Sequence, residues 1–199
     1  MAKRIFDLVF TIPGLILLLP LFCAVALWIR YDSVGPVFFR QKRVGQYGRC
    51  FYIYKFRTMV VDAERLGKQI TVGRDLRVTK SGAFLRKYKL DELPQLINVL
   101  IGDMSLVGPR PEVPRYMDEY SEADRQMVLS VKPGITDNAS IEFRSENEIL
   151  GKSINPEESY IKEILPIKIK YYKKYVSEHS VIGDFLIILK TLVAVFGWR

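Results

Sequence analysis

Apolar residues are concentrated at the start of the chain, where an almost uninterrupted run covers residues 5–29. Asp7 is the only charged residue in this run, whose length is that of a helix crossing a bilayer. A soluble helix would keep a polar face for water, which the run lacks, and a cleavable signal peptide has a shorter apolar core. We therefore predict a membrane-anchoring helix over residues 1–31 and a separate domain over residues 32–199.

The interior of the anchor contains residues that disturb a straight helix. Pro13 and Pro20 each remove a backbone donor, so a bend is expected. Lys3 and Arg4 precede the apolar run and Arg30 follows it, and the positive-inside rule keeps basic residues at both ends in the cytoplasm. This favours a re-entrant helix. A true span stays open, because spanning helices also tolerate proline.

Aromatic and basic residues are interleaved over residues 37–59, around Gly45 and Gly48. Two short runs of this kind joined by a glycine-containing turn predict a β-hairpin. Such a mixture can bind single-stranded nucleic acid, but a surface lying on anionic lipid beside the anchor is the interpretation we favour. Membrane lipid is therefore an expected partner, and nucleic acid is not.

Helical patterns follow the hairpin. A helix is predicted over residues 82–88, within a polar, basic stretch from 59 to 89 whose charges we interpret as mostly solvated. From residue 91 to 101, Leu93, Leu96, Ile97 and Leu100 recur at i, i+3, i+4 and i+7, so this face is expected to pack inward.

The last third of the chain predicts two more helices. Residues 156–175 mix tyrosines with lysines, which indicates an interfacial helix, and the apolar stretch 181–198 indicates a membrane-surface or core helix rather than a second span. The expected fold is α+β and mainly helical: a kinked, re-entrant membrane helix, a short β-hairpin, and amphipathic interfacial helices around a compact domain.

Composition narrows the chemistry. The formal net charge of +8 favours anionic partners such as nucleic acid, phospholipid headgroups or a phosphorylated substrate. Cys23 and Cys50 do not form a secreted disulfide framework, which suits a reducing, cytosolic setting. His179 is the single histidine, which argues against a histidine metal cluster or a Ser/His/Asp triad. Any catalysis must rely on carboxylates and cations.

The adjacent carboxylates Asp91 and Glu92 are the main candidates. Pro94 is acceptable only in a first helical turn, so the predicted helix starts near the pair, where free amides and the macrodipole stabilise anions. A pair at such a place is most often a helix cap. Its neighbours favour a catalytic interpretation.

Two arginines flank this pair in the sequence. Arg86 stands five residues before Asp91, and Arg110 lies between Pro109 and Pro111 in a Gly-Pro-Arg-Pro segment. Because the prolines stiffen the backbone, Arg110 would lose less entropy when its planar guanidinium binds phosphate oxygens.

These residues belong to motifs that resemble the small monotopic polyprenol-phosphate phosphoglycosyl transferases, the bacterial sugar transferases that initiate glycoconjugate assembly. The motifs are KRIFD at 3–7, YKFRTM at 54–59, LDELPQLINV at 90–99, GDMSLVGPRP at 102–111 and KPGIT at 132–136. The chain departs from many relatives at Leu19, where a serine is usual, and over residues 137–144. The second departure leaves the choice of sugar open.

The resemblance implies a reaction at the cytoplasmic face of the bacterial inner membrane. A carboxylate would attack the sugar-bearing phosphate of a UDP-sugar, expel UMP and form a covalent phosphosugar enzyme, from which undecaprenyl phosphate would take the sugar phosphate. Asp91 matches the nucleophile and Glu92 its partner, both beside Mg²⁺. Two anions repel, so Mg²⁺ and Arg86 would have to neutralise them.

The resemblance also assigns substrate contacts. Arg110 matches the nucleotide-binding position, Lys55 matches a basic residue at the rim of the site, and Arg57 is a weaker candidate. Two alternatives stay open: a membrane-associated glycosyltransferase that releases UDP, and a non-catalytic module binding anionic lipid or nucleic acid. The sequence also leaves a homo-oligomer open.

Overall fold

The structure is a computed structural model that describes residues 1–63 and 75–197. This part of the chain is mainly helical and contains two two-stranded sheets, as the expected fold class requires. Arg65, Lys68 and Arg74, expected to be solvated charges, lie outside the described residues. So does Trp198, expected in the last helix.

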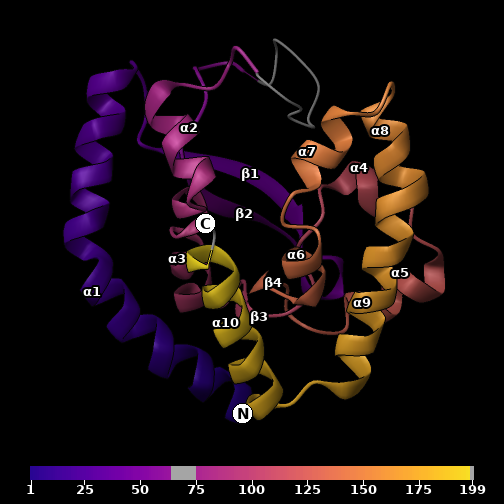
Figure 1. Ribbon diagram of the computed structural model, residues 1–199. Coiled ribbons are helices and arrows are strands. Elements are labelled where there is room, and N and C mark those ends of the chain that lie inside the picture. The colour runs from indigo at the N-terminus through magenta and orange to yellow at the C-terminus, as the bar shows by residue number, and fades with distance from the viewer. Residues whose placement is uncertain (64–74, 198–199) are drawn as a thin grey trace.

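The anchor segment forms one continuous helix, α1 (Ala2–Asp32), with Pro13 and Pro20 inside it. It is long and apolar enough to cross a membrane, and only 11% of its most apolar window is buried. In Figure 1 it runs in indigo along one side of the molecule. The predicted apolar helix is therefore confirmed. Its re-entrant course stays a prediction.

The predicted hairpin is confirmed. Strands β1 (Phe38–Val44) and β2 (Cys50–Phe56) pair antiparallel, with Phe38 opposite Phe56. The turn between them places Tyr47 and Gly48 at φ of 56° and 76°, a left-handed conformation that glycine adopts without a steric cost. Alternation along β2 turns Ile53 into the core.

Helix α2 (Lys80–Lys87) begins two residues before the predicted start, because the Thr79 side chain accepts a hydrogen bond from the Gly82 amide. After α2, Lys89 turns the chain with φ of 56° and residues Leu90–Glu92 form a separate 3₁₀ turn. The next helix, α3 (Gln95–Ile101), starts only after Pro94.

The prediction of a helix start near Asp91 and Glu92 was therefore wrong, because α3 begins at Gln95. Asp91 and Glu92 lie in the 3₁₀ turn, and the helix that follows is only seven residues long. Helix-dipole stabilisation falls off within the first turn, so α3 does little for these carboxylates. Nearby lysine and arginine side chains must stabilise the two carboxylates instead.

The predicted inward face of α3 was wrong for Leu100, whereas Leu96 packs against the core as predicted. The buried residues of this helix are Gln95, Asn98 and Val99, whereas Leu100 is 40% exposed. The Asn98 amide donates to the Tyr52 carbonyl over 2.8 Å and its oxygen accepts from the Tyr54 amide over 2.9 Å. These two bonds turn a polar side chain toward β2. Hydrophobic period alone could not show that.

A second sheet pairs β3 (Ser105–Val107) with β4 (Gly134–Thr136) in parallel. Gly108 and Gly134 pack against each other so closely that a Cβ atom on Gly134 would lie 2.0 Å from the Gly108 nitrogen. Glycine is therefore required at both positions, which explains Gly108 in the GDMSLVGPRP motif and Gly134 in the KPGIT motif.

Most of the remaining helices lie on the side of the sheets opposite α1, as Figure 1 shows for α9, whereas α10 lies beside the start of α1. The remaining helices are α4 (Pro114–Met117), α5 (Glu122–Val128), α6 (Asn138–Glu142), α7 (Glu146–Gly151), α8 (Pro156–Ser159), a π-helical turn (Tyr160–Ile164), α9 (Leu165–Glu178) and α10 (Val181–Phe196).

The predicted helix over 156–175 is thus divided among α8, the π-helical turn and α9. Its interfacial assignment was wrong for Tyr172 and Tyr175, which are 1% and 6% exposed. These tyrosines share a buried face with Leu165 and Lys168, spaced by three or four residues. Helix α10 is different, because Asp184 is buried while Ile182 and Val193 are exposed.

Candidate active site

The 3₁₀ turn that carries Asp91 and Glu92 lies beside β2, because Asn98 fixes α3 to the edge of that strand. The structure brings Lys55 from β2 and Arg110 from the segment after β3 to the same turn. Residues predicted from distant parts of the sequence therefore meet at one place.

Glu92 binds two cations at once. The Lys55 ammonium lies 2.7 Å from Oε1, and the Arg110 guanidinium makes a forked contact of 2.6 Å to Oε1 and 3.1 Å to Oε2. Burial alone would raise the pKa of Glu92, but Arg110 and Lys55 hold it well below its usual range. Glu92 therefore remains ionised and both of its oxygens are occupied.

Asp91 has a different environment. Its side chain is buried, and no residue in the described ranges donates a hydrogen bond to its carboxylate. Burial and the neighbouring charge of Glu92 raise the pKa of Asp91, while Lys55 and Arg86 act in the opposite direction. Its oxygens therefore accept no hydrogen bond from the described residues, unlike those of Glu92.

Arg86 contributes positive charge from the end of α2. Its Nε donates to Thr58 Oγ1 over 2.9 Å, which fixes the guanidinium near the pair. Burial lowers the pKa of Arg86, and the charge of Asp91 partly restores it. Thr58 belongs to the YKFRTM motif, so one task of that motif in this chain is to position Arg86.

Pro109 and Pro111 are buried and support Arg110 through their backbone. The Pro109 carbonyl accepts from the Gly134 amide over 3.0 Å, and the Pro111 carbonyl accepts from Arg43 over 3.0 Å. The predicted stiff backbone around Arg110 is therefore present. Its rigidity comes from β4 and β1 as well as from the proline rings.

Arg57 is placed elsewhere. Its guanidinium donates to the Ser33 carbonyl, the Ser33 hydroxyl and the Val34 carbonyl, at 2.7, 2.8 and 3.0 Å. Ser33 and Val34 are the first residues after α1. Arg57 therefore ties the anchor to β2, and the structure does not bring it to Glu92 with the other candidates.

Sequence reasoning missed Arg43. The strand pattern of β1 alternates exposed and half-buried residues, which turns Arg43 inward on the same face as Gln41. Its pKa is lowered by burial and by the charge of Arg110, and raised by Glu112 and Glu92. The period-2 alternation within the basic stretch was the signal that could have identified it.

A second group behind Arg110 was also missed. Lys168 of α9 is buried, forms an ion pair with Glu146, and lies 5.0 Å from the centre of the Tyr160 ring. The charge of Glu92 raises the pKa of Arg110 well above its usual value, with a smaller contribution from Glu146. No local sequence signal distinguished Lys168 from the exposed lysines of the same helix.

The arrangement suits an anionic substrate. Lys55, Arg86 and Arg110 can bind phosphate oxygens, and Asp91 is a carboxylate with free oxygens between them. Within the described residues no group of three His, Cys, Asp or Glu side chains forms a metal cage. Mg²⁺ does not need one, because it commonly binds through one or two carboxylates together with substrate phosphates.

Comparisons with known proteins agree with this chemistry. A family model described as bacterial sugar transferase matches residues 1–198. Over 99% of its length the chain is 38% identical to the UDP-N-acetylgalactosamine-undecaprenyl-phosphate N-acetylgalactosaminephosphotransferase of Aeromonas hydrophila, covering 45% of that protein. Over its whole length it is 39% identical to the UDP-glucose:undecaprenyl-phosphate glucose-1-phosphate transferase of Xanthomonas campestris pv. campestris, covering 39% of that protein.

The chain spans less than half the length of these two relatives. It matches a third along most of both sequences: the exopolysaccharide production protein ExoY of Sinorhizobium fredii is 33% identical over 98% of this chain and 85% of that protein. Since the family model covers nearly every residue, the resemblance noted from the motifs is confirmed. The chain belongs to the bacterial sugar transferase family.

Proposed function

We propose that the chain transfers a sugar 1-phosphate from a UDP-sugar to undecaprenyl phosphate and releases UMP. The names of relatives from Aeromonas and Xanthomonas describe such transfers to undecaprenyl phosphate, with different sugars. The observation that carries the proposal is the unequal pair: Glu92 is held by two cations, while the buried Asp91 beside it keeps its carboxylate free.

In the first step an Asp91 oxygen attacks the phosphorus that bears the sugar. The bond from that phosphorus to the bridging oxygen breaks, and UMP leaves with the electron pair. The product is an acyl phosphate between Asp91 and the sugar. Arg110 and Lys55 are placed to bind the phosphates, and Arg86 to offset the charge that develops as UMP departs.

In the second step an oxygen of undecaprenyl phosphate attacks the same phosphorus. The bond to Asp91 breaks, the carboxylate is regenerated, and the lipid diphosphate sugar is released. Asp91 must be ionised at the start of each cycle. Lys55 and Arg86 favour this state because their charges lower its pKa against the effect of burial.

Mg²⁺ fits this site through Asp91. Both oxygens of Glu92 already contact Lys55 or Arg110, so Glu92 would have to give up a cation to bind metal. When bound, Mg²⁺ would offset the negative charge of the diphosphate. We therefore assign the expected metal contact to Asp91 and treat Glu92 as the residue that holds the two cations.

We further propose that α1 holds the protein in the bacterial inner membrane, re-entering the leaflet from the cytoplasmic side. A 31-residue helix is about 46 Å long, enough to cross a bilayer. Yet both of its ends contact the same folded part: Asp7 accepts from the Leu106 amide, and Asp32 accepts from the Ser81 amide. A spanning helix would place these ends on opposite sides of the membrane.

The decisive experiment is a panel of UDP-sugars incubated with detergent-solubilised protein, Mg²⁺ and undecaprenyl phosphate, with UMP and UDP measured separately. UMP release supports the proposal, whereas UDP release would support the glycosyltransferase alternative. With sugar-labelled donor and no lipid acceptor, label should remain on Asp91. Full turnover without labelled protein would reject the covalent step, and no nucleotide release from any donor would favour a binding module.

A further inference from the structure

The polar residues at the start of α1 are buried in the folded part rather than exposed at its surface. Asp7 is 2% exposed, and its Oδ1 accepts from the Ser105 hydroxyl over 2.9 Å and the Leu106 amide over 3.0 Å. A carboxylate is costly to bury unless it is hydrogen-bonded. Membrane attachment alone gives no reason for this contact with β3.

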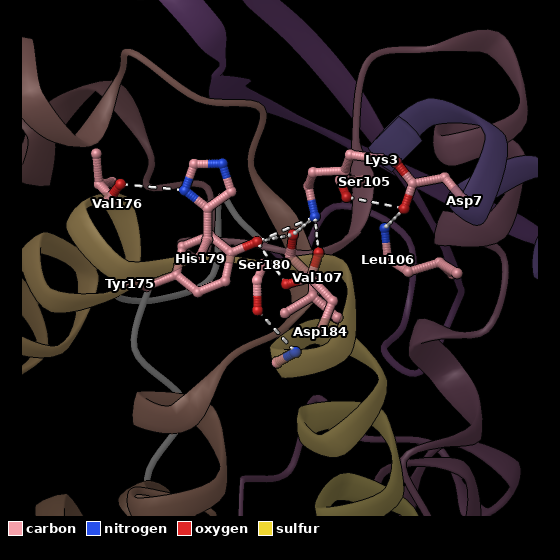
Figure 2. A network of polar contacts seen from close by, with 11 residues as sticks. Lys3, Asp7, Ser105, Leu106, Val107, Tyr175, Val176, His179, Ser180 and Asp184 are labelled. Carbon is pink, nitrogen blue, oxygen red and sulfur yellow. Dashed lines mark hydrogen bonds and ion pairs between the residues drawn. The ribbon is translucent and has the colours of Figure 1, made fainter. Parts of the chain in front are cut away.

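Lys3 makes a second contact with the same strand. Figure 2 shows its ammonium group at the centre of a network, donating to the Val107 carbonyl at 2.9 Å, the Tyr175 hydroxyl at 3.0 Å and Asp184 Oδ2 at 2.5 Å. An ammonium group has three donors, and all three are used. Asp184 is 1% exposed, so this ion pair joins α1 to the first turn of α10.

The backbone that connects this network to Arg110 has little conformational freedom. Val107 is followed by Gly108, which packs so tightly that an added Cβ atom would lie 2.6 Å from the Lys132 carbonyl oxygen. Pro109 comes next, and its ring fixes its φ angle. A shift of β3 would therefore be transmitted to Arg110 rather than absorbed by a flexible loop.

We infer that Lys3, Asp7 and Asp184 are positioning residues for the nucleotide site: the N-terminal turns of α1 hold β3, and β3 holds Arg110 in place to bind the diphosphate. This inference rests on the proposed function of Arg110. It gives the anchor a second task, because the helix that contacts lipid also sets the geometry of a cation in the active site.

The first test replaces Lys3 with methionine, which keeps the stem and removes the ammonium. We expect the KM for the UDP-sugar to rise about tenfold, which corresponds to about 1.4 kcal/mol of binding free energy. The rise should be in KM because Arg110 binds the diphosphate equally in the ground state and the transition state. The kcat and the KM for undecaprenyl phosphate should change by less than threefold. Flotation with vesicles should remain as in the wild type.

Arg4→Met is the matched control. It removes one positive charge from the same helical turn, but Arg4 donates to the Val99 and Leu100 carbonyls at the end of α3 instead of to β3. Its KM for the UDP-sugar should stay within twofold of the wild-type value. If Arg4→Met and Lys3→Met raise the KM equally, charge loss at the membrane explains the effect and the inference is overturned.

Lys3→Met leaves Asp184 buried without its cation, which can impair folding. The double variant Lys3→Met/Asp184→Asn removes that unpaired charge. It still lacks the Lys3 contact to Val107, whose carbonyl is left with the Tyr175 hydroxyl alone, so it should show the same rise in KM with a higher Tm than Lys3→Met. A wild-type KM in the folded double variant would overturn the inference.

A double-mutant cycle with Arg110 distinguishes positioning from general destabilisation. If Lys3 acts through Arg110, adding Lys3→Met to Arg110→Ala should produce no further rise in KM. Additive effects would show that Lys3 acts by another route.

Hydrogen exchange provides a readout that is independent of turnover. Amides of residues 105–108 and of Arg110 should exchange faster in Lys3→Met than in Arg4→Met, Pro109 and Pro111 having no amide hydrogen. Unchanged exchange there would overturn the inference even if the enzyme proved to have another substrate, so its failure is separate from failure of the proposed reaction.

Discussion

Two carboxylates, the half-buried Glu92 and the buried Asp184, each form an ion pair with a lysine, yet their remaining partners differ. At Glu92 the partners are Lys55 and Arg110, two full cations for one anion. At Asp184 the partners are one cation, Lys3, and the neutral hydroxyl of Tyr175. The first group keeps positive charge in excess, whereas the second is balanced.

The difference separates a binding site from a structural joint. Beside Glu92 stands Asp91, a carboxylate whose oxygens accept no hydrogen bond from the described residues. Beside Asp184 the Lys3 donors are fully used, and burial raises the pKa of Tyr175 so that it stays a protonated donor. A bound anion can therefore contact the cations around Glu92, whereas the group around Asp184 offers it no unused cationic donor.

The largest effect should come from Asp91→Asn. Loss of the nucleophile should lower the rate of UMP release by at least about a thousandfold. The same change should raise the Tm at neutral pH. The folded-state pKa of Asp91 is raised, so the free energy of unfolding falls as the pH rises from the unfolded-state pKa to the folded-state pKa. At neutral pH the ionised carboxylate therefore destabilises the fold, and asparagine removes this effect. Calorimetry checks the Tm, with the exposed Asp118→Asn as control, and a fall in Tm would contradict the assignment.

Glu92→Gln should have the opposite effect on stability. Two half-buried cations lose their anion, so we expect a loss of about 2 kcal/mol in the free energy of unfolding at neutral pH. The pKa of Glu92 is depressed, so its stabilisation is present above the unfolded pKa and lost as pH falls toward the folded one. Urea unfolding at several pH values measures this. Equal stability of wild type and variant at neutral pH would show that Glu92 does not hold the cations.

Lys55→Met should move the acidic limb of the kcat profile to higher pH. Lys55 lowers the pKa of Asp91, so without it Asp91 becomes protonated at a higher pH and loses its nucleophilic form earlier as pH falls. The pH dependence of single-turnover UMP release measures the shift. Lys42→Met, an exposed change in the same hairpin, should leave the limb unmoved. A shift to lower pH would contradict the role given to Lys55.

The smallest effect should come from Tyr175→Phe in the balanced group. Loss of one hydroxyl should cost about 1 kcal/mol and lower the Tm by about 2–4 °C. The KM for the UDP-sugar should stay within twofold of wild type, because Lys3 still donates to the Val107 carbonyl. Thermal unfolding with parallel kinetics tests both statements. A large change in KM would place Tyr175 in the nucleotide site.

Much of the site could be predicted from local sequence. Glycines mark the hairpin, and the motifs mark Asp91, Glu92, Arg110 and Lys55. Arg86 was singled out by its place five residues before Asp91. The hydrophobic pattern failed at α3, where Asn98 rather than Leu100 faces inward, because the period of a helix does not say which neighbour covers which face. It failed again at Tyr172 and Tyr175, whose amphipathic rings suit an interface and a core equally.

Long-range polar contacts were beyond reach of any local pattern. Arg57 and Arg110 are both arginines in motifs, but only the tertiary fold shows that Arg57 binds the end of α1 and Arg110 binds Glu92. Lys3 and Asp184 are separated by 181 residues, and no sequence pattern predicts that they form an ion pair.

The burial of Asp7 has a practical consequence for protein engineering. Removing an apolar anchor is the usual route to a water-soluble enzyme for crystallisation or screening. Here deletion of residues 1–31 would also remove Asp7, which accepts hydrogen bonds from the Ser105 hydroxyl and the Leu106 amide. A better strategy keeps α1 and replaces exposed apolar residues in its middle, such as Ile16 and Leu17, with polar ones.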